Sequence, residues 1–294
     1  MAPDGSEARI KYESTLASLA NYAKNYGSMI ESFHKGDMLE RKQKELKDLQ
    51  TWINSSQALK NKYGNALTEL NKLVAQSQEN QERDLILGYI GRTNLIGVSK
   101  RLYRLAHEKN KPDAERKQGY QERDMNRFTQ GMKRVNRRYD AEVDKAVMAH
   151  FIEQYAQFPQ EKRNKTFDDF FGLNKSFDAD ALAKKLEHMH SKTELDKEAV
   201  RLNWMNKSVE DFKNSKDPYI QFAVSQYEND RKLEDKAEQL SGKLAQARPA
   251  FMAAMIAYKK SKGEPVYADA NSSLRITYGN VKGYSPQDGL EATP

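Results

Sequence analysis

The chain has 294 residues, of which 38% are hydrophobic and 31% charged, and it contains no cysteine. The missing cysteines exclude disulfide bonds, thiolate metal sites and a cysteine nucleophile. The formal net charge of +7 is small beside 49 basic and 42 acidic residues, and because both signs are mixed along the chain, a dedicated nucleic-acid surface is not expected.

The first predicted element is an amphipathic helix from about Arg9 to Phe33. Its apolar residues recur in steps of three and four: Tyr12, Leu16, Leu19, Tyr22, Tyr26, Met29, Ile30 and Phe33. A second row, which we call the polar stripe, holds only neutral side chains: Ser18, Asn21, Asn25, Ser28 and Ser32. A fully solvated face of so charged a protein would carry Lys or Glu, so the stripe indicates either the wall of a polar pocket or hydrogen bonds between helices.

Further helices are predicted over about 38–53, 57–77 and 81–108, after a break in which Gly36 ends the first helix and Asp37 caps the second. Apolar residues in near-regular steps of three and four predict one long helix over 113–158, which ends at Pro159. An irregular stretch with clustered phenylalanines follows, and then a helix over 193–208. The last long helix starts at Asp217-Pro218, bends at Pro249 and stops at Gly263.

After Pro265 the pattern changes to period two, over Leu274–Gly279, which predicts one strand followed by a turn. A single strand cannot pair its own backbone groups, so we expect its partners outside this chain. The fold class expected is all-α, a bundle of long antiparallel helices with a short C-terminal strand. The expected division is a helical domain over 1–265 and an extended segment over 266–294.

Sequence motifs for catalysis are missing. There is no glycine-flanked serine turn and no phosphate-binding glycine loop. His188 and His190 could suggest a metal, but residues two apart on a helix point to different sides, so neither a metal nor a cofactor is expected. The basic run 133–138 is flanked by acidic residues on the same helix, which favours surface ion pairs over phosphate contacts.

The N-terminus has no signal-peptide pattern, and no run of about 20 apolar residues could span a membrane. We therefore expect either a cytosolic protein or a segment of a longer precursor. The C-terminal residues Gly289–Pro294 form a turn-like run with no helix to complete, and they favour the second interpretation.

Several stretches together resemble one family, the S46 serine peptidases, which are bacterial dipeptidyl peptidases. The most specific is the block Ala270–Pro286, which reads ANSSLRITYGNVKGYSP, and the others are Asp217–Gln221, Arg137–Asp140, Val143–Ala146 and Arg9–Asn25. The resemblance covers essentially the whole chain. In that family a large helical domain interrupts a chymotrypsin-like double β-barrel, with the triad's histidine and aspartate before it and the serine after it.

The resemblance implies that this chain is the excised helical cap of such an enzyme, without catalytic residues and inactive alone. It also implies that an asparagine of the cap, Asn21 or Asn25, helps to bind the free N-terminus of oligopeptide substrates, because an amide oxygen can accept from an ammonium group. The partners implied are the chain's own catalytic β-barrel and, in the parent enzyme, a second copy in a homodimer. The location implied is the periplasm or cell surface. The alternative is a free-standing helical scaffold or partner-binding protein.

Overall fold

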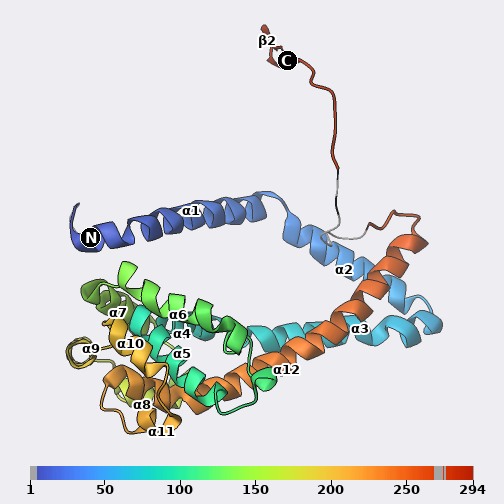
Figure 1. The fold of residues 1–294 in the computed structure, drawn as a ribbon. Helices are drawn as coiled ribbons and strands as arrows, with labels where there is room; N and C mark the ends of the chain where they lie inside the picture. The colour runs from blue at the N-terminus through green and yellow to red at the C-terminus, as the bar shows by residue number, and fades with distance from the viewer. Residues whose placement is uncertain (1–4, 268–273, 275, 294) are drawn as a thin grey trace.

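Helices make up most of the computed structural model, which describes residues 5–267, 274 and 276–293 (Figure 1). This confirms the all-α class. The helices described are α1 (Glu7–Lys35), α2 (Met38–Asn54), α3 (Gln57–Gln78), α4 (Gln81–Ile90), α5 (Asn94–Glu108), α6 (Met125–Arg134), α7 (Ala141–Ala156), α8 (Lys165–Phe171), α9 (Ala179–Lys192), α10 (Glu198–Trp204), α11 (Val209–Lys213) and α12 (Pro218–Ser261). Short 3-10 turns lie at Asp113–Glu115, Glu122–Asp124, Val135–Arg137 and Gln160–Lys162, and the strands are β1 (Tyr284–Gln287) and β2 (Leu290–Ala292).

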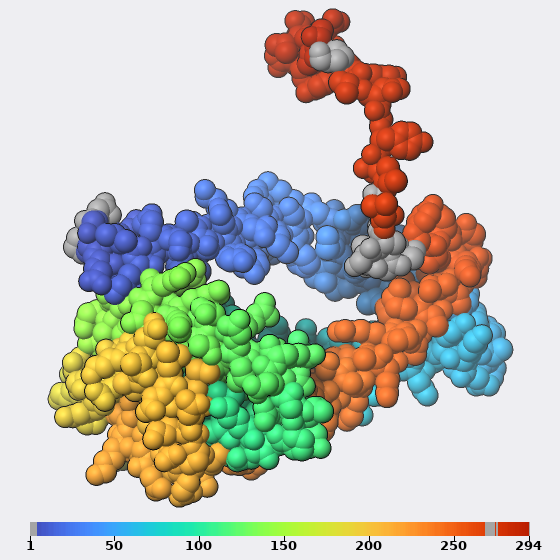
Figure 2. Space-filling model, viewed as in Figure 1, coloured from blue at the N-terminus to red at the C-terminus, as the bar shows by residue number. Residues whose placement is uncertain are grey.

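The molecule has three parts, which we call the body, the corner and the arm. The body gathers α4 to α11 around the first half of α12, the corner joins α2 and α3 to the end of α12, and the arm is α1 (Figure 1). The arm runs back from the corner across the body. Figure 2 shows an opening through the molecule, bounded by α1 and α2 on one side and by the body and α12 on the other.

Two apolar clusters correspond to the body and the corner. The body cluster includes Leu95, Leu102, Met148, Ile152, Phe212 and Ile220, all essentially unexposed. The corner cluster is much smaller and consists of Leu49, Ile53, Ala254 and Tyr258, with Trp52 packed against it. Since α12 contributes to both clusters over its 44 residues, it is the element that fixes their separation.

Local signals placed several helix ends as predicted. Ser56 caps α3 by accepting from the Leu59 backbone N–H at 3.2 Å. Asp217 caps α12 by accepting from the Tyr219 N–H at 2.9 Å, with Pro218 in the first turn. Gly263 follows that helix with φ +73°, a left-handed conformation that glycine adopts at little cost.

The predicted long helix over 113–158 is wrong. The chain turns at Gly119, which has φ +94°, and α7 starts anew at Asp140, whose carboxylate accepts from the Val143 N–H at 3.1 Å. The apolar periodicity is nevertheless continuous, because α6 and α7 both pack on the body cluster. The predicted helix over 81–108 is likewise divided at residues 91–93, and within the one predicted over 193–208 only α10 is helical.

Two further expectations are corrected. Asp37 rather than Gly36 takes the left-handed conformation, with φ 46°, and Asp37 makes no side-chain cap. In the predicted strand Leu274–Gly279, the described residues have no strand structure, while Arg275 lies outside the described residues. The strand structure lies later instead, where β1 and β2 pair antiparallel across the turn at Gly289.

Candidate functional site

The polar stripe of α1 is on the surface. All five of its residues are exposed, and α1 as a whole has no buried residue. Within the part of the chain that the structure describes, neither Asn21 nor Asn25 makes a hydrogen bond, and the Ser18 hydroxyl donates only to the Ser14 carbonyl of its own helix. The stripe therefore neither bridges helices nor forms a half-buried wall in this chain, and both asparagine amides are free to bind something else.

The direction in which the stripe points follows from the side of α1 that contacts the body. Ala8, Arg9, Tyr12 and Leu16 of α1 line a groove against α7. At about 100° per residue, the five stripe residues lie about 120–180° around the helix from Tyr12. The stripe thus faces away from the body, on the outer side of the arm.

The apolar side of α1 faces the other way. Leu19, Tyr26 and Ile30 lie within about 40° of Tyr12 around the helix axis, so they point toward the opening that Figure 2 shows. They are 57%, 58% and 58% exposed, respectively, because no part of the body reaches them. The arm is amphipathic as predicted, but only its first turns rest on the body.

A polar contact at Tyr12 joins the arm to the body. The Asn94 side-chain amide donates to the Tyr12 hydroxyl at 3.4 Å and to Asp144 Oδ1 at 3.0 Å. Asp144 also accepts from the backbone N–H groups of Asn94 at 3.0 Å and Leu95 at 3.5 Å. The carboxylate of α7 therefore caps α5, since Thr93 at the cap position turns its hydroxyl back to the Ile90 carbonyl.

Burial is the main cause of the pKa shifts of the two ionisable groups in this contact, Asp144 and Tyr12. The side chain of Asp144 is 2% exposed, and burial raises the pKa of its carboxyl, against the opposing effect of the hydrogen bonds from Asn94 and Leu95. Burial and the nearby Asp144 charge also raise the pKa of Tyr12. The tyrosine consequently keeps its proton.

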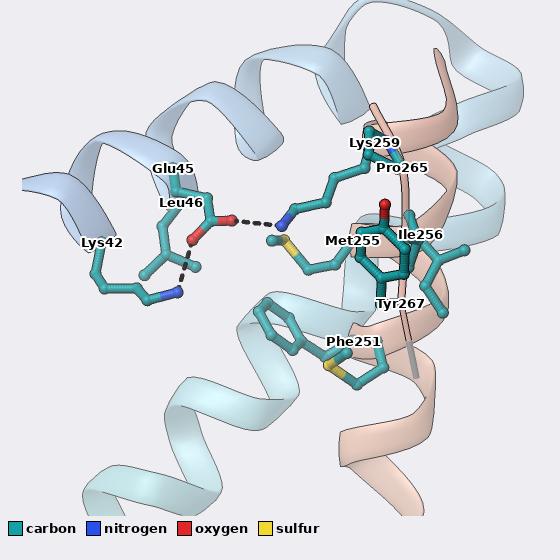
Figure 3. Close-up of a pocket in the computed structure, with 11 residues that line it drawn as sticks. Lys42, Glu45, Leu46, Phe251, Met255, Ile256, Lys259, Pro265 and Tyr267 are labelled. Atoms are coloured by element: carbon teal, nitrogen blue, oxygen red, sulfur yellow. Dashed lines mark hydrogen bonds and ion pairs between the residues drawn. The ribbon is translucent and has the colours of Figure 1, made fainter. Parts of the chain in front are cut away.

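The corner holds a second hollow, of about 580 Å³, between α2 and the end of α12 (Figure 3). Phe251, Met255 and Ile256 line one wall, and Figure 3 shows Glu45 between Lys42 and Lys259 at its rim. The Glu45 carboxylate lies 2.9 Å from Lys42 Nζ and 3.4 Å from Lys259 Nζ, and the hydrogen bond from Lys42 lowers its pKa. With its one carboxylate already paired to two lysines, this hollow is suited to apolar contact and not to proton transfer.

His188 and His190 lie in different surroundings. His190 lies between the Leu186 carbonyl and the Tyr219 hydroxyl, with Nδ1 at 3.0 and 2.9 Å from them, whereas His188 is exposed. In the described residues no three His, Asp or Glu side chains are placed to hold a metal ion. No described helix is long and apolar enough to cross a membrane.

Comparison with known proteins identifies the family. The model of the peptidase S46 family matches residues 1–294. The chain belongs to this family. An Asp/Glu-specific dipeptidyl-peptidase of Shewanella putrefaciens is 35% identical over all of this chain and 39% of its own length, and a dipeptidyl-peptidase 7 of Porphyromonas endodontalis is 25% identical over 96% of this chain and 33% of its own.

A solved member of the family shares the fold. The crystal structure of Porphyromonas endodontalis DPP11 in complex with the dipeptide Arg-Glu superimposes with a TM-score of 0.58, at 22% identity, over 98% of this chain and 40% of the other. The S46 chain described here thus spans about two fifths of the length of such relatives. The predicted family is confirmed. The contact between Tyr12, Asn94 and Asp144 was not predicted, because no local sequence pattern connects residues that are 50 and 82 positions apart.

Proposed function

We propose that this chain is the helical cap of a serine dipeptidyl-peptidase, and that the outer face of α1 binds the free N-terminus of peptide substrates through Asn21 and Asn25. The family supports the parent activity, and the coverage of about two fifths supports a cap that works with a separate catalytic β-barrel domain. In this proposal the cap alone hydrolyses nothing, and the barrel pairs with the extended C-terminal segment. The parent enzyme acts in the periplasm or at the cell surface.

The observation that carries the proposal is the polar stripe: five neutral polar side chains in a row, all exposed and all turned away from the body. A substrate's α-ammonium group offers three donors and needs oxygen acceptors around it. The backbone positions of Asn21 and Asn25 are about 6 Å apart along the helix axis, four residues at 1.5 Å each. Two such acceptors on one face can share a single ammonium group.

Anchoring the amine is a way to set the length of the product. If the substrate is held by its N-terminus, the peptide bond placed at the catalytic serine is always the same number of residues away. A cap that binds the amine therefore determines which peptide bond lies at the catalytic serine, without contacting that bond itself.

The test uses the full-length protein with Asn21→Ala, Asn25→Ala and the double substitution. A hydrogen bond to a charged group contributes about 1.5–3 kcal/mol, so loss of the anchor is expected to lower kcat/KM for a dipeptidyl fluorogenic amide by about 10- to 150-fold. Asn71→Ala, an exposed asparagine on α3, is the matched control and should be silent.

A second measurement separates anchoring from general damage. The parent enzyme should prefer a free N-terminus over an N-acetylated one, and the asparagine variants should lose that preference. Wild-type kcat/KM and wild-type preference in the double variant would show that the stripe does not bind the amine. Cell fractionation of the native host tests the location.

A further inference from the structure

Asn21 and Asn25 can meet the substrate's α-amine only if the orientation of α1 relative to the body is fixed, and two angles describe that orientation. One is the roll of α1 about its own axis, which decides whether the polar stripe or the apolar side faces outward. The other is its tilt relative to the body. A helix of 29 residues with no buried side chain has little apolar packing to hold either angle.

The contact at Tyr12 is placed to fix both. It lies within the first turns of α1, and beyond Leu16 the apolar side chains of the arm are largely exposed. Its hydroxyl accepts from Asn94, whose amide is itself held by the buried carboxylate of Asp144. Asp144 is in turn fixed by the α5 backbone that it caps. The Tyr12 hydroxyl thus links the arm to a chain of hydrogen bonds anchored in α5 and α7.

A small change in the tilt of α1 at Tyr12 causes a large displacement of the asparagines farther along the helix. Asn21 and Asn25 lie nine and thirteen residues beyond Tyr12, or about 14 and 20 Å along the helix. A tilt of about 10° at Tyr12 would therefore move Asn25 by about 3 Å. Misplacement of a group by about 1 Å can already cost about 100-fold in kcat/KM.

We propose that Tyr12, held by Asn94 and Asp144, is a positioning residue that fixes the roll and tilt of α1 and so places Asn21 and Asn25 against the substrate's α-amine. This inference rests on the proposed function. It adds a residue that does not touch the substrate and acts through the two that do. It also assigns a purpose to the Asn94 side chain, which the cap of α5 does not need, because the backbone N–H groups of Asn94 and Leu95 make that cap.

The experiment is a double-mutant cycle in the full-length protein. Tyr12→Phe removes only the hydroxyl, and Asn94→Ala removes the bridging amide while leaving the backbone cap of Asp144 in place. Each is expected to raise KM for a free dipeptidyl amide by about 5- to 20-fold with kcat nearly unchanged, and the double variant should be no worse than either single one. Tyr22→Phe is the matched control, since this tyrosine is on the same helix and 58% exposed.

Hydrogen exchange provides the readout of the arm itself. Amides of residues 7–35 should exchange faster in Tyr12→Phe and Asn94→Ala than in wild type or Tyr22→Phe, while α5 keeps its protection. Additive effects in the cycle, a loss confined to kcat, or unchanged exchange in α1 would each overturn the role of Tyr12.

The two proposals fail differently. If Asn21→Ala and Asn25→Ala are silent, the amine site is wrong, and the positioning role falls with it even if α1 exchanges faster in Tyr12→Phe. If the asparagine variants are damaged while Tyr12→Phe is silent, only the role of Tyr12 is overturned.

Discussion

Arg201 makes the most sharply testable prediction about stability. Its side chain is 0% exposed, and no carboxylate in the part of the chain that the structure describes forms an ion pair with it. Instead it donates to the carbonyls of Met132 at 2.9 Å, of Leu195 at 2.8 Å and of Asp196 at 2.8 Å, and to the Asn136 side-chain oxygen. One guanidinium therefore joins α10 to the end of α6 and to the turn before α10. Burial lowers its pKa, although an arginine stays charged at any physiological pH.

The cost of removing it can be worked out from these contacts. Arg201→Met keeps an unbranched side chain of similar reach but leaves four acceptors without their donor. The carbonyls of Met132 and Leu195 are in buried contacts, and each buried, unpaired acceptor costs about 1–3 kcal/mol. The other two are partly buried, so water can replace the donor. Methionine carries no charge, so the variant avoids the free-energy cost of burying a guanidinium, and this offsets part of the destabilisation. We expect the unfolding free energy to fall by about 3 kcal/mol in total.

The two tryptophans allow the effect to be located. Trp204 packs on Phe212 in the body at a ring distance of 4.6 Å, whereas Trp52 lies in the corner. Urea unfolding followed by fluorescence in a Trp52→Phe background therefore reports the body alone. Arg201→Met should lower the unfolding free energy there by about 3 kcal/mol, while the exposed Arg137→Met should change it by less than about 0.5 kcal/mol. A change below about 1 kcal/mol for Arg201→Met would refute the reasoning.

Three further predictions concern single contacts. Leu49→Ala, at a fully buried position in the corner, should cost about 2–5 kcal/mol, seen in the fluorescence of Trp52 in a Trp204→Phe background. Pro249→Ala, at an exposed position inside α12, should stabilise the protein by up to about 3 kcal/mol in calorimetry, because it restores a helix hydrogen bond. Burial raises the pKa of Asp144, so the folded state binds its proton more tightly than the unfolded state, and this stability is lost as the pH rises above the ordinary value of 3.8. Asp144→Asn should therefore gain stability relative to wild type as the pH is raised above 3.8 in urea titrations, and a pH-independent difference would contradict the shift.

Helices bounded by strong local signals were predictable from sequence. The bounds predicted for α2, α3 and α12 agree with the structure within a residue or two, since Ser56 and Asp217-Pro218 act on backbone groups only a few positions away. Apolar periodicity, by contrast, reports which side of the chain is buried and says nothing about whether the backbone is continuous. The prediction of one long helix over 113–158 failed for that reason, because α6 and α7 use the same core.

The candidate site was only partly predictable. The row of neutral side chains was visible in the sequence, but its two interpretations, a pocket wall and helix–helix hydrogen bonds, both assumed that α1 packs along its length. The stripe is exposed because only the first turns of α1 contact the body. Where α1 meets the body depends on contacts such as that of Tyr12 with Asn94, 82 positions away. Contacts of that range leave no periodic trace, so the direction of the stripe could come only from the structure.

Because α1 has an apolar side and a polar stripe, its orientation about its own axis matters for the proposed mechanism. The apolar side faces the opening and the polar stripe faces outward, so the arm cannot be rolled by half a turn without exchanging the surfaces that it presents. An isolated helix has no preference between those two orientations, and at 3.4 Å the hydrogen bond at Tyr12 is a weak one. Its influence comes from its place at the end of the arm that rests on the rigid body, where a small change in angle is amplified along about 20 Å of helix. If the amine site is where we propose, its precision is therefore determined outside the site, in the contact between α1, α5 and α7.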